Sequence, residues 1–166
     1  MYLEPLFQQY AGRPHPLAYR SRYELVVMVI LSAQDSDRHI NQVAPSLFAV
    51  WPTLASLAKA TPEDLHPYIS TVRNFANKAR WLVSLAQMVE DDERIPYTLE
   101  ALTALPGIGR KSASVIIRES GGAAEGIIVD LHVVRVAPRI GLSSGKRPDA
   151  IEKDLMRIIP MSRWNE

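Results

Sequence analysis

Apolar residues recur every three or four positions along most of the chain, a spacing that is typical of helices burying one face. Residues 75–90 show this clearly, with one apolar side formed by Ala79, Leu82, Leu85, Ala86 and Val89. The stretch 26–31 is apolar nearly all round, which predicts a buried central helix. No segment alternates apolar and polar residues for long enough to form a strand. The pattern therefore predicts an all-α fold of about nine or ten short helices.

Residues that favour helix ends mark the boundaries of the predicted helices. Ser21-Arg-Tyr-Glu24 has the form of a capping box, and Thr61-Pro62 places a proline in a first helical turn. Asp37 is expected to cap the helix that follows it. The other predicted helices cover residues 3–10, 37–50, 75–90, 130–140 and 148–159.

A helix, a glycine-rich turn and a second helix are predicted between Thr98 and Arg118. Leucines at 99, 102 and 105 recur at helical spacing until Pro106 and Gly107 end the first helix, and Gly109 follows at once. Glycines let another backbone come close, and the first amides of a helix can hold an anion. The pattern therefore predicts a helix-hairpin-helix motif. A DNA phosphate is one anion that the first amides of its second helix could hold.

Composition and charge narrow the function classes only slightly. The net charge is +1, but the span from Pro106 to Arg147 holds seven basic and three acidic residues, a local balance of +4 (7 − 3). A basic face suits DNA, although ordinary solvated helix faces explain the same charges. The absence of cysteine excludes disulfides and any cysteine-ligated zinc or iron–sulfur site within this sequence. The histidines are scattered and suggest no metal site.

The start of the sequence and its apolar runs bear on where the protein works. No run approaches the roughly 18 apolar residues of a membrane span, and Met1 is not followed by a secretory signal pattern. We therefore expect a cytoplasmic protein that does not associate with membranes.

The run Leu105-Pro-Gly-Ile-Gly-Arg-Lys-Ser-Ala113, followed by Val129-Asp-Leu-His132, resembles the helix-hairpin-helix DNA glycosylases, most closely the endonuclease III branch. Leu31-Ser-Ala-Gln-Asp-Ser-Asp37 and Asn77-Lys-Ala79 resemble two further segments of that family. The resemblance implies a two-lobed helical fold with a DNA cleft. One lobe would be a helical barrel over about residues 20–125, and the other would combine 1–19 with 126–166, the whole forming one compact unit.

The resemblance also implies roles for individual residues. Lys111 would be an amine nucleophile, and Asp130 a carboxylate that supports positive charge on the sugar while also capping a helix. The two would face each other across the cleft. The simpler alternative for Lys111 is a surface lysine that contacts a phosphate. Residues expected to contact DNA are Gln34, which would enter the gap left by a flipped nucleotide, together with Gly107, Gly109, Arg110 and Ser112.

The function implied is a base-excision-repair glycosylase with abasic-site lyase activity, acting as a monomer on damaged double-stranded DNA, with oxidised pyrimidines as the expected lesions. A non-catalytic or truncated hairpin DNA-binding protein is the first alternative, and a mismatch-specific glycosylase of the same superfamily is the second. The sequence departs from endonuclease III in two ways. The four-cysteine iron–sulfur segment is not present, so a monovalent cation at the hairpin is the only bound ion expected. Val72-Arg-Asn-Phe75 replaces the family's Ile-Gly-Leu-Tyr, so Asn74 stands where a leucine wedge is usual.

Overall fold

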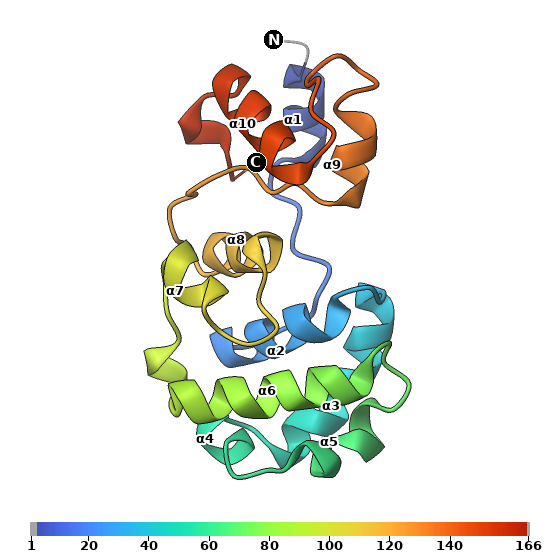
Figure 1. Cartoon of the computed structure of the whole chain (residues 1–166), viewed down its shortest axis with the longest axis vertical. Helices are drawn as coiled ribbons and strands as arrows, with labels where there is room; N and C mark the ends of the chain where they lie inside the picture. The colour runs from blue at the N-terminus through green and yellow to red at the C-terminus, as the bar shows by residue number, and fades with distance from the viewer. Residues whose placement is uncertain (1–2, 166) are drawn as a thin grey trace. The chain divides into compact units, whose positions relative to one another are not determined.

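The computed structural model describes residues 3–165, and in this part of the chain every regular element is helical (Figure 1). This confirms the predicted all-α fold. The α-helices are α1 (Glu4–Tyr10), α2 (Arg22–Ser32), α3 (Asp37–Val50), α4 (Leu54–Leu57), α5 (Pro62–Ile69), α6 (Phe75–Val89), α7 (Leu99–Thr103), α8 (Arg110–Glu119), α9 (Leu131–Val136) and α10 (Pro148–Ile158). Short 3-10 helices cover Asp92–Arg94 and Met161–Arg163. Within the described residues, no helix is long and apolar enough to cross a membrane.

The chain divides into two compact units. One runs from Pro16 to Ile116, and the other joins the part up to His15 with the part from Ile117 onward. The lobes predicted over 20–125 and over 1–19 with 126–166, and the cleft between them, stay predictions.

The unit Pro16–Ile116 is built around α2. Nine consecutive residues of this helix, Tyr23 to Leu31, are buried, which confirms the predicted central helix. Helices α3 and α6 pack directly against it. The Ser21 side chain caps α2 by accepting from the Glu24 amide at 3.1 Å, while the Glu24 carboxylate accepts from the Arg20 amide at 2.7 Å. The capping box is therefore present in a modified form, because the Glu24 carboxylate accepts from the amide of Arg20 and not from that of the capping residue Ser21.

Most helices of this unit begin at a side-chain cap. Thr53 and Thr61 cap α4 and α5 in full capping boxes, as expected of threonine before a helix. The predicted cap of α3 was wrong. Ser36 is the capping residue, with its hydroxyl accepting from the His39 amide at 3.2 Å, and Asp37 is the first residue of the helix. Serine and aspartate cap about equally well, so adjacent candidates could not be ranked from the sequence.

The other unit has a small core of its own. Ala137, Ile151, Leu155 and Ile159 are buried in it with Leu3, and partly buried residues including Val129, Val133 and Trp164 pack against them. Helix α9 ends at Val136, whereas a helix as far as residue 140 was predicted. Pro138 explains the difference, since it has no N–H to donate to the carbonyl four residues before it.

Candidate DNA-binding and catalytic residues

The hairpin lies between α7 and α8. Thr98 caps α7, and Leu102 and Leu105 bury the apolar side of this first helix. Gly107 then turns the chain with a φ of +80°, a conformation that side chains with a Cβ rarely adopt. A Cβ at this position would also lie 3.0 Å from Cβ of Trp81, closer than ordinary packing allows. The fold itself therefore requires glycine at 107.

Gly109 is different, because nothing described around it requires a glycine. Its φ is not in the left-handed region, and a Cβ built on it would meet no described atom within 4 Å. Its carbonyl accepts the Ala113 amide at 2.9 Å, so Gly109 occupies the capping position of α8. A residue without a side chain thus stands at the start of a ten-residue helix, where amides point outward and the helix dipole is positive.

The next residues of α8 present the predicted DNA-binding and catalytic groups. Arg110 and Lys111 are exposed and Ser112 is half-buried, whereas Ala113 and Ile116 are buried and hold the helix in place. Lys111 therefore carries an accessible amine at the second position of the helix. The structure brings together Gly107, Gly109, Arg110, Lys111 and Ser112 at one turn.

Asp130 is the N-terminal cap of α9. Its Oδ1 accepts from the amides of His132 and Val133, both at 2.8 Å, which confirms the predicted cap. The preceding Ile127 and Val129 and the following Val133 pack on the core of their unit, so the carboxylate is held from both sides of the turn. Among the described residues, no donor bonds to Oδ2, so this oxygen can accept from another partner. Lys111 and Asp130 belong to different compact units, and their meeting at one substrate stays a prediction.

Gln34 lies just after α2 in a left-handed conformation, with a φ of +61°, and is exposed. The turn before it is held by Lys78, whose Nζ donates to the carbonyl oxygens of Leu31 and Ala33, both at 2.7 Å. Lys78 is only 1% exposed, and burial lowers its pKa. Sequence reasoning did not assign Lys78 this role. A signal was available, because Lys78 shares the apolar face of residues 75–90 with Leu82 and Leu85.

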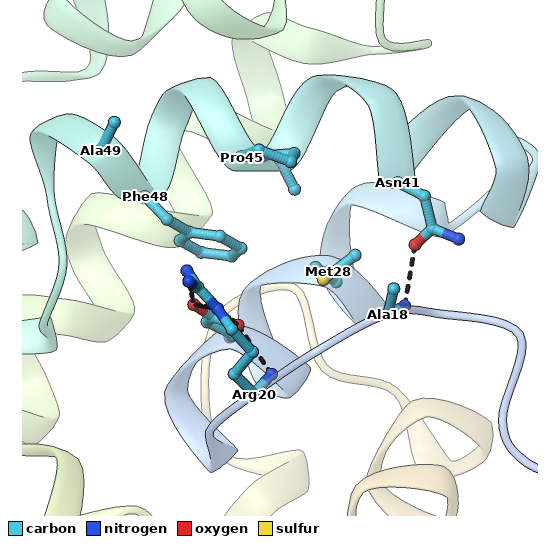
Figure 2. A pocket seen from close by; sticks show the side chains of 9 residues that line it. Ala18, Arg20, Met28, Asn41, Pro45, Phe48 and Ala49 are labelled. Atoms are coloured by element: carbon cyan, nitrogen blue, oxygen red, sulfur yellow. Dashed lines mark hydrogen bonds and ion pairs between the residues drawn. The ribbon is translucent and has the colours of Figure 1, made fainter.

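A cavity of about 380 Å³ lies between the segment leading into α2 and helix α3 (Figure 2). At its rim, Asn41 Oδ1 accepts the Ala18 amide at 2.9 Å, and Glu24 pairs with Arg20 at 2.7 Å. The described lining residues do not include Gln34 or the hairpin residues. Because its charged groups neutralise each other and it lies apart from the predicted site residues, we assign it no part in the site.

No group of His, Cys, Asp or Glu side chains in residues 3–165 is arranged to hold a metal ion.

The chain is similar to known proteins over most of its length. Residues 27–161 match the model of the HhH-GPD superfamily base excision DNA repair proteins. Endonuclease III of Treponema pallidum (strain Nichols) is 39% identical over 158 residues, covering 92% of this chain and 74% of that protein. Endonuclease III of Synechocystis sp. is 36% identical over 157 residues, covering 93% and 72%.

Among solved structures, a trapped endonuclease III–DNA covalent intermediate, an estranged-adenine complex, superposes with a TM-score of 0.90. It is 32% identical and covers 98% of this chain and 78% of that chain. The similarity therefore extends through the hairpin and through the turn that holds Asp130. The chain belongs to the HhH-GPD superfamily of base excision DNA repair proteins, as a homologue of endonuclease III.

Proposed function

We propose that this endonuclease III homologue is a base-excision-repair DNA glycosylase with abasic-site lyase activity, and that oxidised pyrimidines are its lesions. The observation that carries the proposal is the exposed amine of Lys111, one residue into a helix that follows the Gly107–Gly109 turn. The solved relative in a covalent DNA intermediate supports a covalent step in this chain as well.

The hairpin supplies the grip on DNA. Gly109 has room for a side chain within the protein, so the lack of one is best explained by a partner that must approach the backbone closely. A phosphate would accept the outward amides of α8 and lie at the positive end of its dipole. The guanidinium of Arg110 and the hydroxyl of Ser112 would add charge and hydrogen bonds. These contacts position the duplex without reading its sequence.

Lys111 would act as the nucleophile after losing a proton. Its Nζ lone pair forms a bond to C1′ of the damaged nucleotide, the N-glycosidic bond breaks, and its electron pair leaves with the base. The sugar ring opens to a Schiff base on Nζ. Removal of a C2′ proton then expels the 3′ phosphate, which cuts the strand, and water releases the lysine from the product.

Asp130 would act on the sugar rather than on the base. As the base departs, the sugar gains oxocarbenium-like positive charge, and a fixed carboxylate stabilises it. The cap geometry suits this role, because two amides hold Oδ1 while Oδ2 stays available. Removal of a proton from the Lys111 ammonium is the second task we assign to this carboxylate.

We also propose a monovalent cation at the hairpin, held by backbone carbonyl oxygens of the Gly107–Gly109 turn. Backbone carbonyl oxygens are the donors that hard cations prefer, and a glycine turn can direct several of them to one point. Such an ion would strengthen phosphate binding, and no chemical step depends on it. The partner we propose is damaged double-stranded DNA, bound by a monomer inside the cell.

Borohydride reduction of the Schiff base tests the lyase function directly. Wild-type protein should become covalently attached to abasic DNA. Lys111→Gln should still bind the duplex but form adduct about a thousandfold more slowly or not at all, because the nucleophile is gone. Lys146→Gln is the matched control, since it removes another exposed lysine from the same basic span. Undiminished trapping by Lys111→Gln would assign the nucleophile to a different amine. No trapping by wild type would favour a non-catalytic DNA-binding protein.

A further inference from the structure

Two exposed turn residues of the unit Pro16–Ile116, Gln34 and Asn74, share an uncommon left-handed backbone conformation. Gln34 has a φ of +61° and Asn74 has a φ of +59°, and neither is a glycine. Gln34 follows α2 and Asn74 precedes α6, and these two helices pack against each other (Figure 1). In the left-handed region, residues other than glycine are strained, and they persist there where neighbouring contacts hold them.

Asp35 supplies those contacts. Its Oδ2 accepts the amide of Arg73 at 2.9 Å, which ties the residue after Gln34 to the residue before Asn74. Its Oδ1 accepts the Ser36 amide and the Nδ1–H of His39, both at 2.8 Å. The Nε2 of His39 in turn contacts the hydroxyl of Thr71 at 3.1 Å. One carboxylate and one imidazole thus join residues 34–39 to residues 71–74.

The junction between residues 34–39 and 71–74 is stabilised by the partial burial and the negative charge of Asp35. The Asp35 side chain is 12% exposed. Burial raises its pKa, but the amide of Arg73, the ring of His39 and the amide of Ser36 outweigh that effect and lower the pKa to about 2. The carboxylate is therefore ionised at neutral pH. The negative charge of Asp35 also favours the charged form of Lys78, the buried lysine that holds the end of α2.

The chemistry exposed at the junction suits an unpaired base in a duplex. Gln34 and Asn74 are both amides, which can pair with the hydrogen-bonding edge of a base. The Asn74 oxygen accepts from Asn77 Nδ2 at 2.7 Å, so the donor end of the Asn74 amide is the one that can serve a partner. Arg73, the residue before Asn74, is exposed, and its positive charge could attract a nearby phosphate.

We propose that Asp35 is a positioning residue that holds Gln34 and Asn74 as one rigid polar edge for the strand opposite a flipped nucleotide. The proposal rests on the proposed function and on the role that the family resemblance implies for Gln34, which would enter the gap in the duplex. Fixing both turn residues before DNA arrives removes ordering costs that would otherwise weaken binding. Asp35 itself need not touch DNA.

The test compares Asp35→Ala with Asp92→Ala. Asp92 is a matched control because its carboxylate also accepts an amide 38 residues away in the same unit, that of Leu54 at 2.7 Å. The probe is a duplex with a stable tetrahydrofuran abasic analogue, beside the same oligonucleotide as a single strand. Asp35→Ala should weaken duplex binding about tenfold with little effect on the single strand. Asp92→Ala should leave both affinities near wild type.

Two further variants separate positioning from general destabilisation. Asp35→Asn keeps an oxygen for the Arg73 amide but loses the acceptor shared by Ser36 and His39, so it should lose less duplex affinity than Asp35→Ala. In a Gln34→Ala/Asn74→Ala background, Asp35→Ala should add no further loss, because the groups it positions are absent. A full tenfold loss in that background, or an equal loss in Asp92→Ala, would overturn the proposal. If Asp35→Ala weakens duplex binding as expected but the wild-type protein forms no borohydride adduct, the proposed lyase function is wrong and the positioning role of Asp35 still holds.

Discussion

The helices that carry Lys111 and Asp130 begin in different ways. At α9 the capping residue is Asp130, and its carboxylate accepts two amides of the first turn at 2.8 Å. At α8 the capping residue is Gly109, which has no side chain, and the space where one would stand is open among the described residues. One helix start is satisfied by an anion of the protein, whereas the other has room for an anion from outside.

This difference shows how one local structure can serve two purposes. The outward amides and positive dipole of a helix start are the same in both places. In the proposed function, Asp130 uses them to anchor a catalytic carboxylate, whereas Gly109 leaves them free to bind a phosphate. Exchanging or neutralising the capping residue should therefore separate the contribution of helix stability from that of function.

Among variants of the two helix starts and the turn, the largest effect is expected from Asp130→Asn, which keeps the cap and removes the charge. Asparagine caps about as well as aspartate, so the melting temperature should stay within about 3 °C of wild type. Excision should fall about a hundred- to a thousandfold, equivalent to roughly 3–4 kcal/mol of transition-state stabilisation. The measurement is single-turnover excision of an oxidised pyrimidine from a duplex.

Cleavage of a ready-made abasic site is the control for Asp130→Asn. That reaction should slow less, because the base has already left. Near-normal excision by the variant would reduce Asp130 to a cap and nothing more.

A smaller effect is expected from Gly107→Val, which disrupts the turn leading into α8. Valine would be strained at a φ of +80° and would press on Trp81, so the unfolding free energy should fall by about 2–3 kcal/mol. Binding to damaged and undamaged duplex should weaken alike, since phosphate contacts carry no sequence information. Thermal melting and titration with both duplexes measure the two effects.

Gly141→Val is the matched control for the turn variant. Gly141 has a φ of +76°, but a Cβ there would meet no described atom within 4 Å, so only the backbone strain remains. Its DNA affinity should stay near wild type. If Gly107→Val lost only damaged-duplex binding, the hairpin would not be a general phosphate site.

The smallest effect, and the most direct exchange, is Gly109→Asp. Aspartate should cap α8 slightly better than glycine, so stability should be unchanged or a few tenths of a kcal/mol higher. Duplex affinity should nevertheless fall at least about tenfold, or ~1.4 kcal/mol, because the new carboxylate repels the phosphate. Gly109→Asn caps without charge and should lose less. Equal losses in the two variants would point to steric exclusion instead of charge.

Much of the fold follows from short-range signals in the sequence. Helix α3 lies over residues 37–50 as predicted, and Thr61 caps α5. Capping residues and apolar spacing act between residues a few positions apart, so they can be recognised without knowledge of the tertiary structure. The hairpin could be predicted from the sequence for the same reason, because its candidate site residues lie close together in the chain, from Gly107 to Ser112.

Contacts between distant segments could not be predicted in this way. Nothing in the local sequence links the Asp35 carboxylate to the Arg73 amide, 38 residues away, although the structure joins them at 2.9 Å. Lys78 shows the same limit, because lysine is usually solvated and its burial depends on carbonyls at the end of another helix. The departure at Asn74 was visible in the sequence, but its left-handed conformation was not.

The burial of Lys78 also makes this side chain a chemical probe of unfolding. Lys78 is 1% exposed, and its amine donates to two carbonyl oxygens at the end of α2, so an acylating reagent in solution can reach it only when that contact opens. Lys111, on the surface, should react at once. The ratio of the two labelling rates, read by mass spectrometry of peptides, would report the opening free energy of the α2–α6 contact in the intact protein.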